Sequence, residues 1–127
     1  MRQMSFSLTT EQMLARTKTV TRRLGWADLK PSTLLQAVEK SQGLKKGERV
    51  RKLCVIRVVS VRREPLSAIS CSAMLYRKNG TIEASREGFP GITGAEFVER
   101  FCRGMRCEPY REVTRIEFEH VQEACLA

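Results

Sequence analysis

The chain has 127 residues, of which 42% are hydrophobic and 29% are charged. This length suits one domain with a single core, spanning 1–127, and excludes a two-domain enzyme. The apolar runs are far shorter than the about 20 residues that a membrane span needs. We therefore expect a soluble protein without a membrane partner.

Positive charge is concentrated in the first half of the chain. The formal net charge is +9; residues 1–63 carry 15 basic and 4 acidic side chains, and residues 64–127 carry 8 and 10. A polyanion would be attracted to the first half. From charge alone, a basic surface that only maintains solubility is an equally good interpretation.

Five cysteines make an odd count, and no apolar leader-like segment follows Met1. These features favour a reducing, cytoplasmic location. The spacing from Cys102 to Cys107 is longer than that of a C-x-x-C ligand pair, and the only histidine, His120, falls in a predicted strand. We expect no metal site and expect the thiols to be buried in the core.

The first half of the chain predicts four elements. Residues 4–8 fit a short strand, and a helix of about two turns follows Thr9, with Met13 and Leu14 facing inward. Residues 34–38 fit either one helical turn or one strand. Glycines at 43 and 47 bound a tight basic loop. The segment 50–62 contains the run 53–59, which is apolar except at Arg57, and predicts the central strand, ended by Pro65.

The second half begins with Asn79-Gly80, which predicts a type I′ turn joining strands 73–78 and 81–85 into a hairpin. A loop follows at 87–91. The Thr93-x-x-Glu96 capping box predicts a helix that ends near Gly104. Its apolar face would carry Phe97, Val98, Phe101, Cys102 and Met105. Alternation over 114–119 predicts a half-buried strand in which Thr114, Ile116 and Phe118 face one side and Arg115, Glu117 and Glu119 the other.

This order of elements is too irregular for βαβ units and has too few helices for a bundle. We therefore predict an α+β fold: a mixed or antiparallel sheet of about five to six strands, curled toward a small barrel and flanked by two or three helices.

One short segment carries a candidate site. Lys18, Thr21, Arg22 and Arg23 lie within six residues, and Lys18 and Thr21 share a face only where the backbone is not a regular strand. If they converge, a lysine with a pKa lowered by burial would accept the proton of the threonine hydroxyl. Glu87 could then donate or accept a proton. The competing interpretation, favoured by the pattern alone, is a surface lysine, strand threonines and a loop carboxylate.

Six stretches, in the same order along the chain, resemble the ASCH domain family of the PUA-like fold, and in particular its small stand-alone bacterial and phage members. The stretches are 10–12 (TEQ), 17–26 (TKTVTRRLGW), 44–48 (LKKGE), 63–66 (REPL), 87–90 (EGFP) with 96–98 (EFV), and 113–118 (VTRIEF).

The resemblance implies a small PUA-like β-barrel with a cleft that carries the motif G-x-K-x-x-E-x-R. Lys18 and Arg23 match this motif, whereas Arg16 replaces its glycine and Thr21 its glutamate. A threonine at this place resembles the N4-acetylcytidine amidohydrolases of the family. In that branch Thr21 would be the nucleophile, Lys18 its base and Glu87 the acid/base group.

Other features suit a longer ligand. Lys45, Lys46, Arg49 and Arg51 would contact phosphates of RNA or another nucleic acid, Arg22 and Arg23 would line the cleft, and Trp26 and Phe89 would stack on bases. We therefore expect an ASCH domain that binds RNA or a nucleobase-containing ligand through its K-x-x-T-x-R motif. An amidohydrolase acting on a modified nucleoside and a protein-interaction module are the alternatives. None of the three needs a cofactor or a metal.

Overall fold

A computed structural model of the chain describes residues 1–70 and 80–122, which form an α+β fold around a five-stranded mixed sheet. The strand order is β1-β3-β4-β5-β2; β1 runs parallel to β3, and all other neighbours are antiparallel. The strands are β1 (Gln3–Ser5), β2 (Val20–Arg23), β3 (Leu34–Val38), β4 (Lys52–Pro65) and β5 (Glu112–Val121). The predicted fold class is confirmed.

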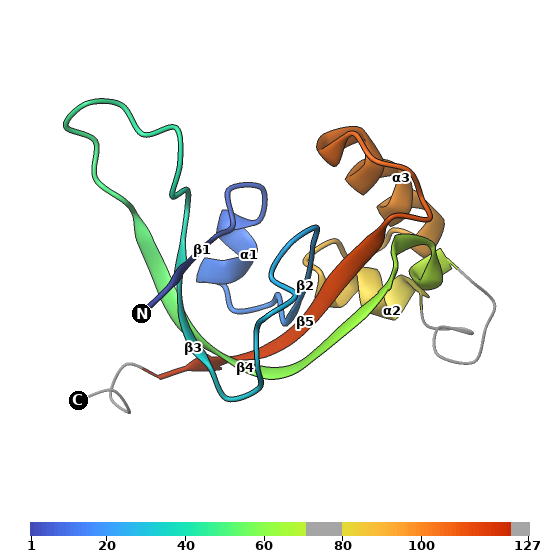
Figure 1. Ribbon diagram of the computed structural model, residues 1–127, viewed down its shortest axis with the longest axis horizontal. Helices are drawn as coiled ribbons and strands as arrows, with labels where there is room; N and C mark the ends of the chain where they lie inside the picture. Colours follow the sequence, from blue (N-terminus) through green and yellow to red (C-terminus); the bar gives the residue numbers. More distant parts are fainter. Residues whose placement is uncertain (71–79, 123–127) are drawn as a thin grey trace.

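The predicted central strand is β4, which pairs with β3 and β5 and does end at Pro65. A bulge between Val58 and Ser60 interrupts its register with β5, and the two strands form a long curved ribbon (Figure 1). The curvature does not close the sheet into a full barrel, because β1 and β2 remain its two edges among the described strands. Residues 34–38, which fitted helix or strand, form β3.

The helices are α1 (Thr10–Leu14), the 3₁₀ helix η1 (Leu66–Ser70), α2 (Gly80–Arg86) and α3 (Gly94–Met105). The sheet curves around α1, whereas α2 and α3 lie together at one end of the β4–β5 ribbon (Figure 1). Among residues 1–70 and 80–122, no helix is long and apolar enough to span a bilayer.

The start of α3 confirms the predicted capping box. The Thr93 hydroxyl accepts a hydrogen bond from the Glu96 backbone N–H (3.1 Å), and the Thr93 N–H donates to the Glu96 carboxylate (3.3 Å). Phe97 and Val98 are buried as predicted. Met105, however, is 45% exposed, because the last turn of α3 extends beyond the core. The helix ends at Met105, with Arg106 as its C-cap, rather than at Gly104.

The start of the chain differs from prediction in two details. The first strand covers Gln3–Ser5 rather than 4–8, because the chain turns after Phe6 toward α1. Met13 is buried, but Leu14 is 43% exposed. The prediction for Leu14 was wrong because α1 has only five residues and turns a single apolar position to the sheet.

The predicted hairpin is wrong. Its second arm, 81–85, belongs to α2, while the first arm, 73–78, lies outside the described residues. Gly80 does not serve a I′ turn. A side chain there would bring a Cβ atom within 2.6 Å of the Ile69 carbonyl oxygen, so the glycine allows α2 to approach η1 closely.

Within residues 1–70 and 80–122, most buried apolar side chains fall into two clusters. The first lies between the sheet and α1 and includes Met4, Phe6, Met13, Ile56 and Phe118. The second lies beneath η1, α2 and α3 and includes Leu66, Ile69, Ala84, Phe97 and Val113.

Candidate functional site

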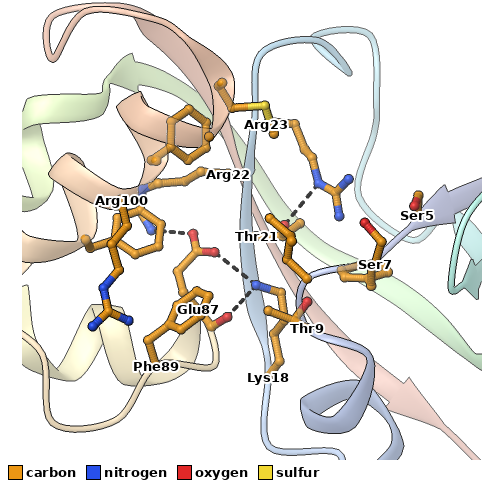
Figure 2. Close-up of a pocket in the computed structure, with 16 residues that line it drawn as sticks. Ser5, Ser7, Thr9, Lys18, Thr21, Arg22, Arg23, Glu87, Phe89 and Arg100 are labelled. Carbon is orange, nitrogen blue, oxygen red and sulfur yellow. Dashed lines mark hydrogen bonds and ion pairs between the residues drawn. The ribbon is translucent and has the colours of Figure 1, made fainter.

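A pocket of about 530 Å³ lies between β2, α3 and the segment that joins β1 to α1 (Figure 2). Its walls come from both core clusters, with Phe6 on one side and Phe89, Phe97 and Phe101 on the other. This volume falls within the range of about 300–1,000 Å³ that is usual for small-molecule sites.

The structure brings most of the predicted site residues together. The residues that line the pocket include Lys18, Thr21, Arg22, Arg23, Glu87 and Phe89. Lys18 precedes β2 and has irregular backbone, so its side chain and that of Thr21 reach the same pocket although a regular strand would separate them. Glu87 follows α2 directly. Its backbone N–H donates to the Glu83 carbonyl oxygen (3.1 Å), which is the bond that the next residue of a helix would make.

Lys18 is held by Glu87 through two contacts. Its Nζ lies 3.0 Å from Glu87 Oε1 and also donates to the Glu87 carbonyl oxygen. The Lys18 side chain is only 3% exposed. Burial lowers the pKa of Lys18, and the facing Glu87 carboxylate offsets this only in part. The charged form of this lysine therefore depends on Glu87.

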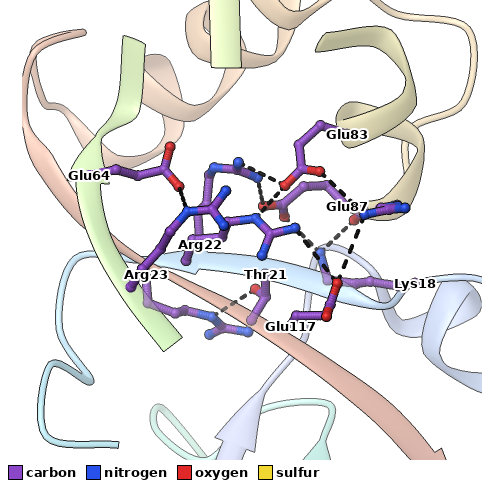
Figure 3. Close-up of polar contacts among 11 residues, drawn as sticks. Lys18, Thr21, Arg22, Arg23, Glu64, Glu83, Glu87 and Glu117 are labelled. Atoms are coloured by element: carbon purple, nitrogen blue, oxygen red, sulfur yellow. Dashed lines mark hydrogen bonds and ion pairs between the residues drawn. The ribbon is translucent and has the colours of Figure 1, made fainter. Parts of the chain in front are cut away.

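Glu87 belongs to a buried charge cluster, which we define as Lys18, Arg22, Glu83, Glu87 and Arg115 (Figure 3). Arg22 bridges the two carboxylates, with Nη1 2.9 Å from Glu87 Oε2 and Nη2 2.9 Å from Glu83 Oε1. Arg115 Nε also donates to Glu83 Oε1. Arg115 Nη2 also lies 3.9 Å from Glu117 Oε1, and Arg86 Nη1 lies 3.9 Å from Glu83 Oε2, so the ion pairs continue from the cluster toward the surface.

Glu83 is held as an anion by its partners. Burial alone would raise its pKa, but the hydrogen bond from Arg115 and the charge of Arg22 outweigh burial and keep the pKa below its usual value. Sequence reasoning missed Glu83 and Arg115, because the first fell in a predicted hairpin and the second on the predicted solvent side of a strand. The spacing of Glu83 and Glu87, four residues apart, would have indicated one helical face if α2 had been recognised.

Arg23 and Arg100 add positive charge to the pocket lining (Figure 2). Arg23 Nε donates to the Thr21 hydroxyl (3.1 Å), and its guanidinium lies 4.7 Å from the centre of the Phe6 ring. Neither arginine has a carboxylate within salt-bridge distance among the described residues. Burial lowers the pKa of Arg23 to about 10. Arg100 was not predicted.

Other predicted ligand residues lie elsewhere. Trp26 packs against the first core cluster, with the Arg2 guanidinium 4.3 Å from its ring centre, and does not line the pocket. Lys45, Lys46, Arg49 and Arg51 lie on the basic loop, which we define as residues 39–51 between β3 and β4. This loop projects from the end of the molecule opposite α3 (Figure 1).

The basic loop is only partly neutralised. Two ion pairs lie within it or at its end, Lys40 with Glu48 (3.1 Å) and Arg51 with Glu39 (2.8 Å). Lys45, Lys46 and Arg49 are exposed and make no ion pair with any described residue. The loop therefore presents three cations to solvent.

No group of three or more metal-ligating side chains occurs within residues 1–70 and 80–122. His120, the only histidine, lies on β5 with its Nε2 2.8 Å from the Lys18 carbonyl oxygen and its Nδ1 3.6 Å from Cys54 Sγ. It thus holds the backbone of Lys18 from outside the pocket.

The fold matches two solved structures over most of the chain. A crystal structure of an ASCH domain from Lactobacillus crispatus JV V101 aligns with a TM-score of 0.54 and 14% identity, over 94% of this chain and 78% of that one. A protein from Enterococcus faecalis V583, described by the family name DUF984, aligns with a TM-score of 0.54 and 16% identity, over 93% and 71%. No family model and no curated protein matches the sequence. The chain therefore has an ASCH-like fold, as its sequence motifs predicted.

Proposed function

We propose that this chain binds single-stranded RNA and takes one nucleobase, with an adjoining phosphate, into the pocket beside Lys18 and Thr21. The observation that carries the proposal is the pair Arg23 and Arg100, which line the pocket without a carboxylate partner among the described residues. Arg23 is half-buried and Arg100 is exposed at the pocket rim. A half-buried guanidinium without a counter-ion is costly, and a phosphate held between the two arginines would supply that counter-ion.

The remaining surface of the pocket suits a base. Phe89 is half-buried and offers an aromatic face, and Ser7 and Thr21 contribute hydroxyls to the lining. Stacking on aromatic side chains is worth about 1–3 kcal/mol per base, and hydroxyls can donate to or accept from base edges. The pocket therefore combines the apolar, polar and cationic contacts that a nucleotide requires.

The fold and the basic loop support the same proposal. ASCH domains are generally thought to bind RNA, and this chain shares their fold. A strand longer than one nucleotide would extend from the pocket to other cations, and Lys45, Lys46 and Arg49 are available for its phosphates.

The test is fluorescence anisotropy with a labelled single-stranded RNA oligonucleotide. Arg23→Gln and Arg100→Gln should each weaken binding roughly tenfold, because a charge-assisted contact is worth about 1.5–3 kcal/mol. Arg103→Gln is the matched control, since Arg103 lies one turn beyond Arg100 on α3, outside the pocket, and pairs with Glu99. If all three variants bind as the wild type does, the pocket is not the RNA site.

A second function is favoured by a separate observation: Lys18, Thr21 and Glu87 line one pocket, and burial lowers the pKa of Lys18. This arrangement supports deacylation of an N4-acylated cytidine. Lys18 would first pass a proton to Glu87 and then take the hydroxyl proton of Thr21 as Thr21 Oγ1 attacks the acyl carbon. Glu87 would give its proton to the leaving amine, which restores the charged pair of Lys18 and Glu87. Water would then hydrolyse the threonine ester.

Incubation with N4-acetylcytidine tests this reaction, with released cytidine measured by chromatography. Activity should be present in the wild type and lost in Thr21→Val, which keeps the side-chain shape but removes the hydroxyl. Thr19→Val is the control, because this neighbouring threonine does not line the pocket. A wild type that releases no cytidine excludes this reaction but leaves the RNA-binding proposal unaffected.

A further inference from the structure

The C-terminus of α3 brings two cysteines together. Arg106 has a left-handed conformation (φ 53°, ψ 51°), and its N–H donates to the Cys102 carbonyl oxygen. The N–H of Cys107 donates to the same oxygen (3.3 Å). The bond from Cys107 is the 6→1 bond of a Schellman motif, and the bond from Arg106 is the 5→1 bond of an αL cap. Such caps frequently bring together the side chains at the two ends of the six-residue segment. Here those ends are Cys102 and Cys107.

The two thiols are neighbours in this cap. Burial and the nearby Cys107 thiol raise the pKa of Cys102, and both residues are half-buried against the second core cluster. Both are free cysteines. Cys102 and Cys107 are five residues apart, farther than the two cysteines of a C-x-x-C ligand pair. The cap of the helix nevertheless brings them close together.

We propose that Cys102 and Cys107 are a modification site, a dithiol that closes to an intramolecular disulfide when it meets a small disulfide oxidant such as oxidised glutathione. One thiolate attacks a sulfur of the oxidant, forms a mixed disulfide and releases one glutathione thiolate. The second protein thiol loses its proton and attacks the protein sulfur of the mixed disulfide, which releases the second glutathione. Two protein thiols are oxidised and one oxidised glutathione is reduced to two thiols.

Neighbouring structure favours this pair over the other cysteines. Cys54 is buried and lies against His120, which limits its access to an oxidant. Cys71 and Cys125 lie outside the described residues. Phe101 and Met105 lie on either side of Cys102 in the last turns of α3, and both line the pocket. The disulfide would therefore restrict the movement of one wall of the pocket.

The experiment uses the full chain with Cys71→Ser and Cys125→Ser, treated with oxidised glutathione under native conditions and then alkylated. Trypsin cleaves after Arg103 and Arg106, so Cys102 and Cys107 fall in separate peptides, 101–103 and 107–111. Mass spectrometry should find these two peptides linked, with the loss of two hydrogens. Persistent glutathione adducts on single cysteines, without linked peptides, would overturn the proposal.

Two substitutions at Arg106 test whether the helix cap positions the thiols. Arg106→Gly keeps the left-handed conformation, so linking should proceed at least as fast as in the parent chain. Arg106→Val disfavours that conformation, because a β-branched residue rarely adopts positive φ, and linking should slow several-fold. Circular dichroism confirms that each variant is folded. Equal rates in all three chains would show that short separation in sequence, and not the cap, joins the cysteines.

Discussion

Glu83 is the residue on which the buried charge cluster depends, because both Arg22 and Arg115 donate to its Oε1. Glu83→Ala would leave two buried guanidinium groups short of a counter-ion, and breaking a buried pair in this way costs about 3–5 kcal/mol. We expect a large fall in the free energy of unfolding, measured by urea denaturation.

The matched control for Glu83 is Glu99→Ala. Glu99 also pairs with an arginine, Arg103, at 2.6 Å, but both side chains are about 70% exposed. Exposed pairs of this kind are worth about 0–1 kcal/mol. Similar losses of stability in the two variants would contradict a structural role for the buried charge cluster.

His120 should make stability depend on pH. The Lys18 carbonyl can only accept a hydrogen bond, so Nε2 carries the proton and Nδ1 is free to accept from the Cys54 thiol. Burial lowers the pKa of His120, so folding favours the neutral form of this histidine. As pH falls, the unfolded chain therefore takes up a proton on His120 before the folded chain does. The contribution of His120 to the free energy of unfolding is complete above the ordinary histidine pKa of about 6.5, and it is lost as pH falls through the lower pKa of the folded chain.

Urea denaturation at about pH 7.5 and about pH 5.5, on either side of the ordinary histidine value, measures this effect. The wild type should have the lower midpoint at the lower pH. His120→Gln keeps an N–H donor but does not titrate, so its midpoint should change less between the two conditions. An equal change in both proteins would assign the pH dependence to other groups.

At the residue scale, the sequence selected three residues that the structure places at one pocket. Lys18, Thr21 and Glu87 were selected by chemistry and by resemblance, and all three line the pocket. Glu83 and Arg115 were missed because each meets a partner far along the chain. Strand alternation indicates that Arg115 faces away from the apolar residues of β5, but not that α2 covers that side.

At the element scale, most strands and α3 followed from local patterns, whereas α2 did not. Asn79-Gly80 is a strong local signal for a hairpin, but tertiary packing decides the structure here. Gly80 and Gly94 both lie against the Ile69 carbonyl, so that α2, α3 and η1 meet with almost no side chain between their backbones. Such contacts between distant segments leave no periodic trace in the sequence.

The close contact predicts opposite effects for two glycines of α3. A Cβ at Gly94 would overlap the Ile69 carbonyl group, so Gly94→Ala should destabilise the fold by about 1–3 kcal/mol through overpacking. A methyl group at Gly104 would meet nothing within 4 Å, and Gly104→Ala should stabilise the helix by up to about 0.5–1 kcal/mol. Thermal unfolding of both variants measures the two effects, and a neutral Gly94→Ala would contradict the close packing of α3 on η1.

On the scale of the whole molecule, the positive charge of the first half divides into two regions. Lys18, Arg22 and Arg23 lie at the pocket, and the basic loop projects from the other end of the sheet. The composition predicted an excess of positive charge and placed it in the first half of the chain. It did not predict this separation, which arises because the segment after β2 and then strand β3 carry the chain away from the pocket before the basic loop begins (Figure 1).

The separation predicts how RNA binding depends on salt. For single strands, the logarithm of the binding constant falls with the logarithm of salt concentration, with a slope of about −0.7 for each phosphate contact. If Lys45, Lys46 and Arg49 each contact a phosphate, replacing all three by glutamine should make the slope shallower by about 2. Anisotropy titrations of one RNA over a series of salt concentrations measure this slope.

A second triple variant separates local contacts from net charge. Arg57, Arg63 and Arg103 are surface arginines that pair with Glu119, Glu112 and Glu99, and none of them lies in the basic loop or lines the pocket. Replacing these three by glutamine removes the same formal charge, so a general attraction would alter binding equally in both triple variants. If the basic loop itself contacts the phosphates, the control triple variant should keep a salt slope near that of the wild type. The slope counts the counter-ions released by individual phosphate contacts, and this variant removes none of those contacts.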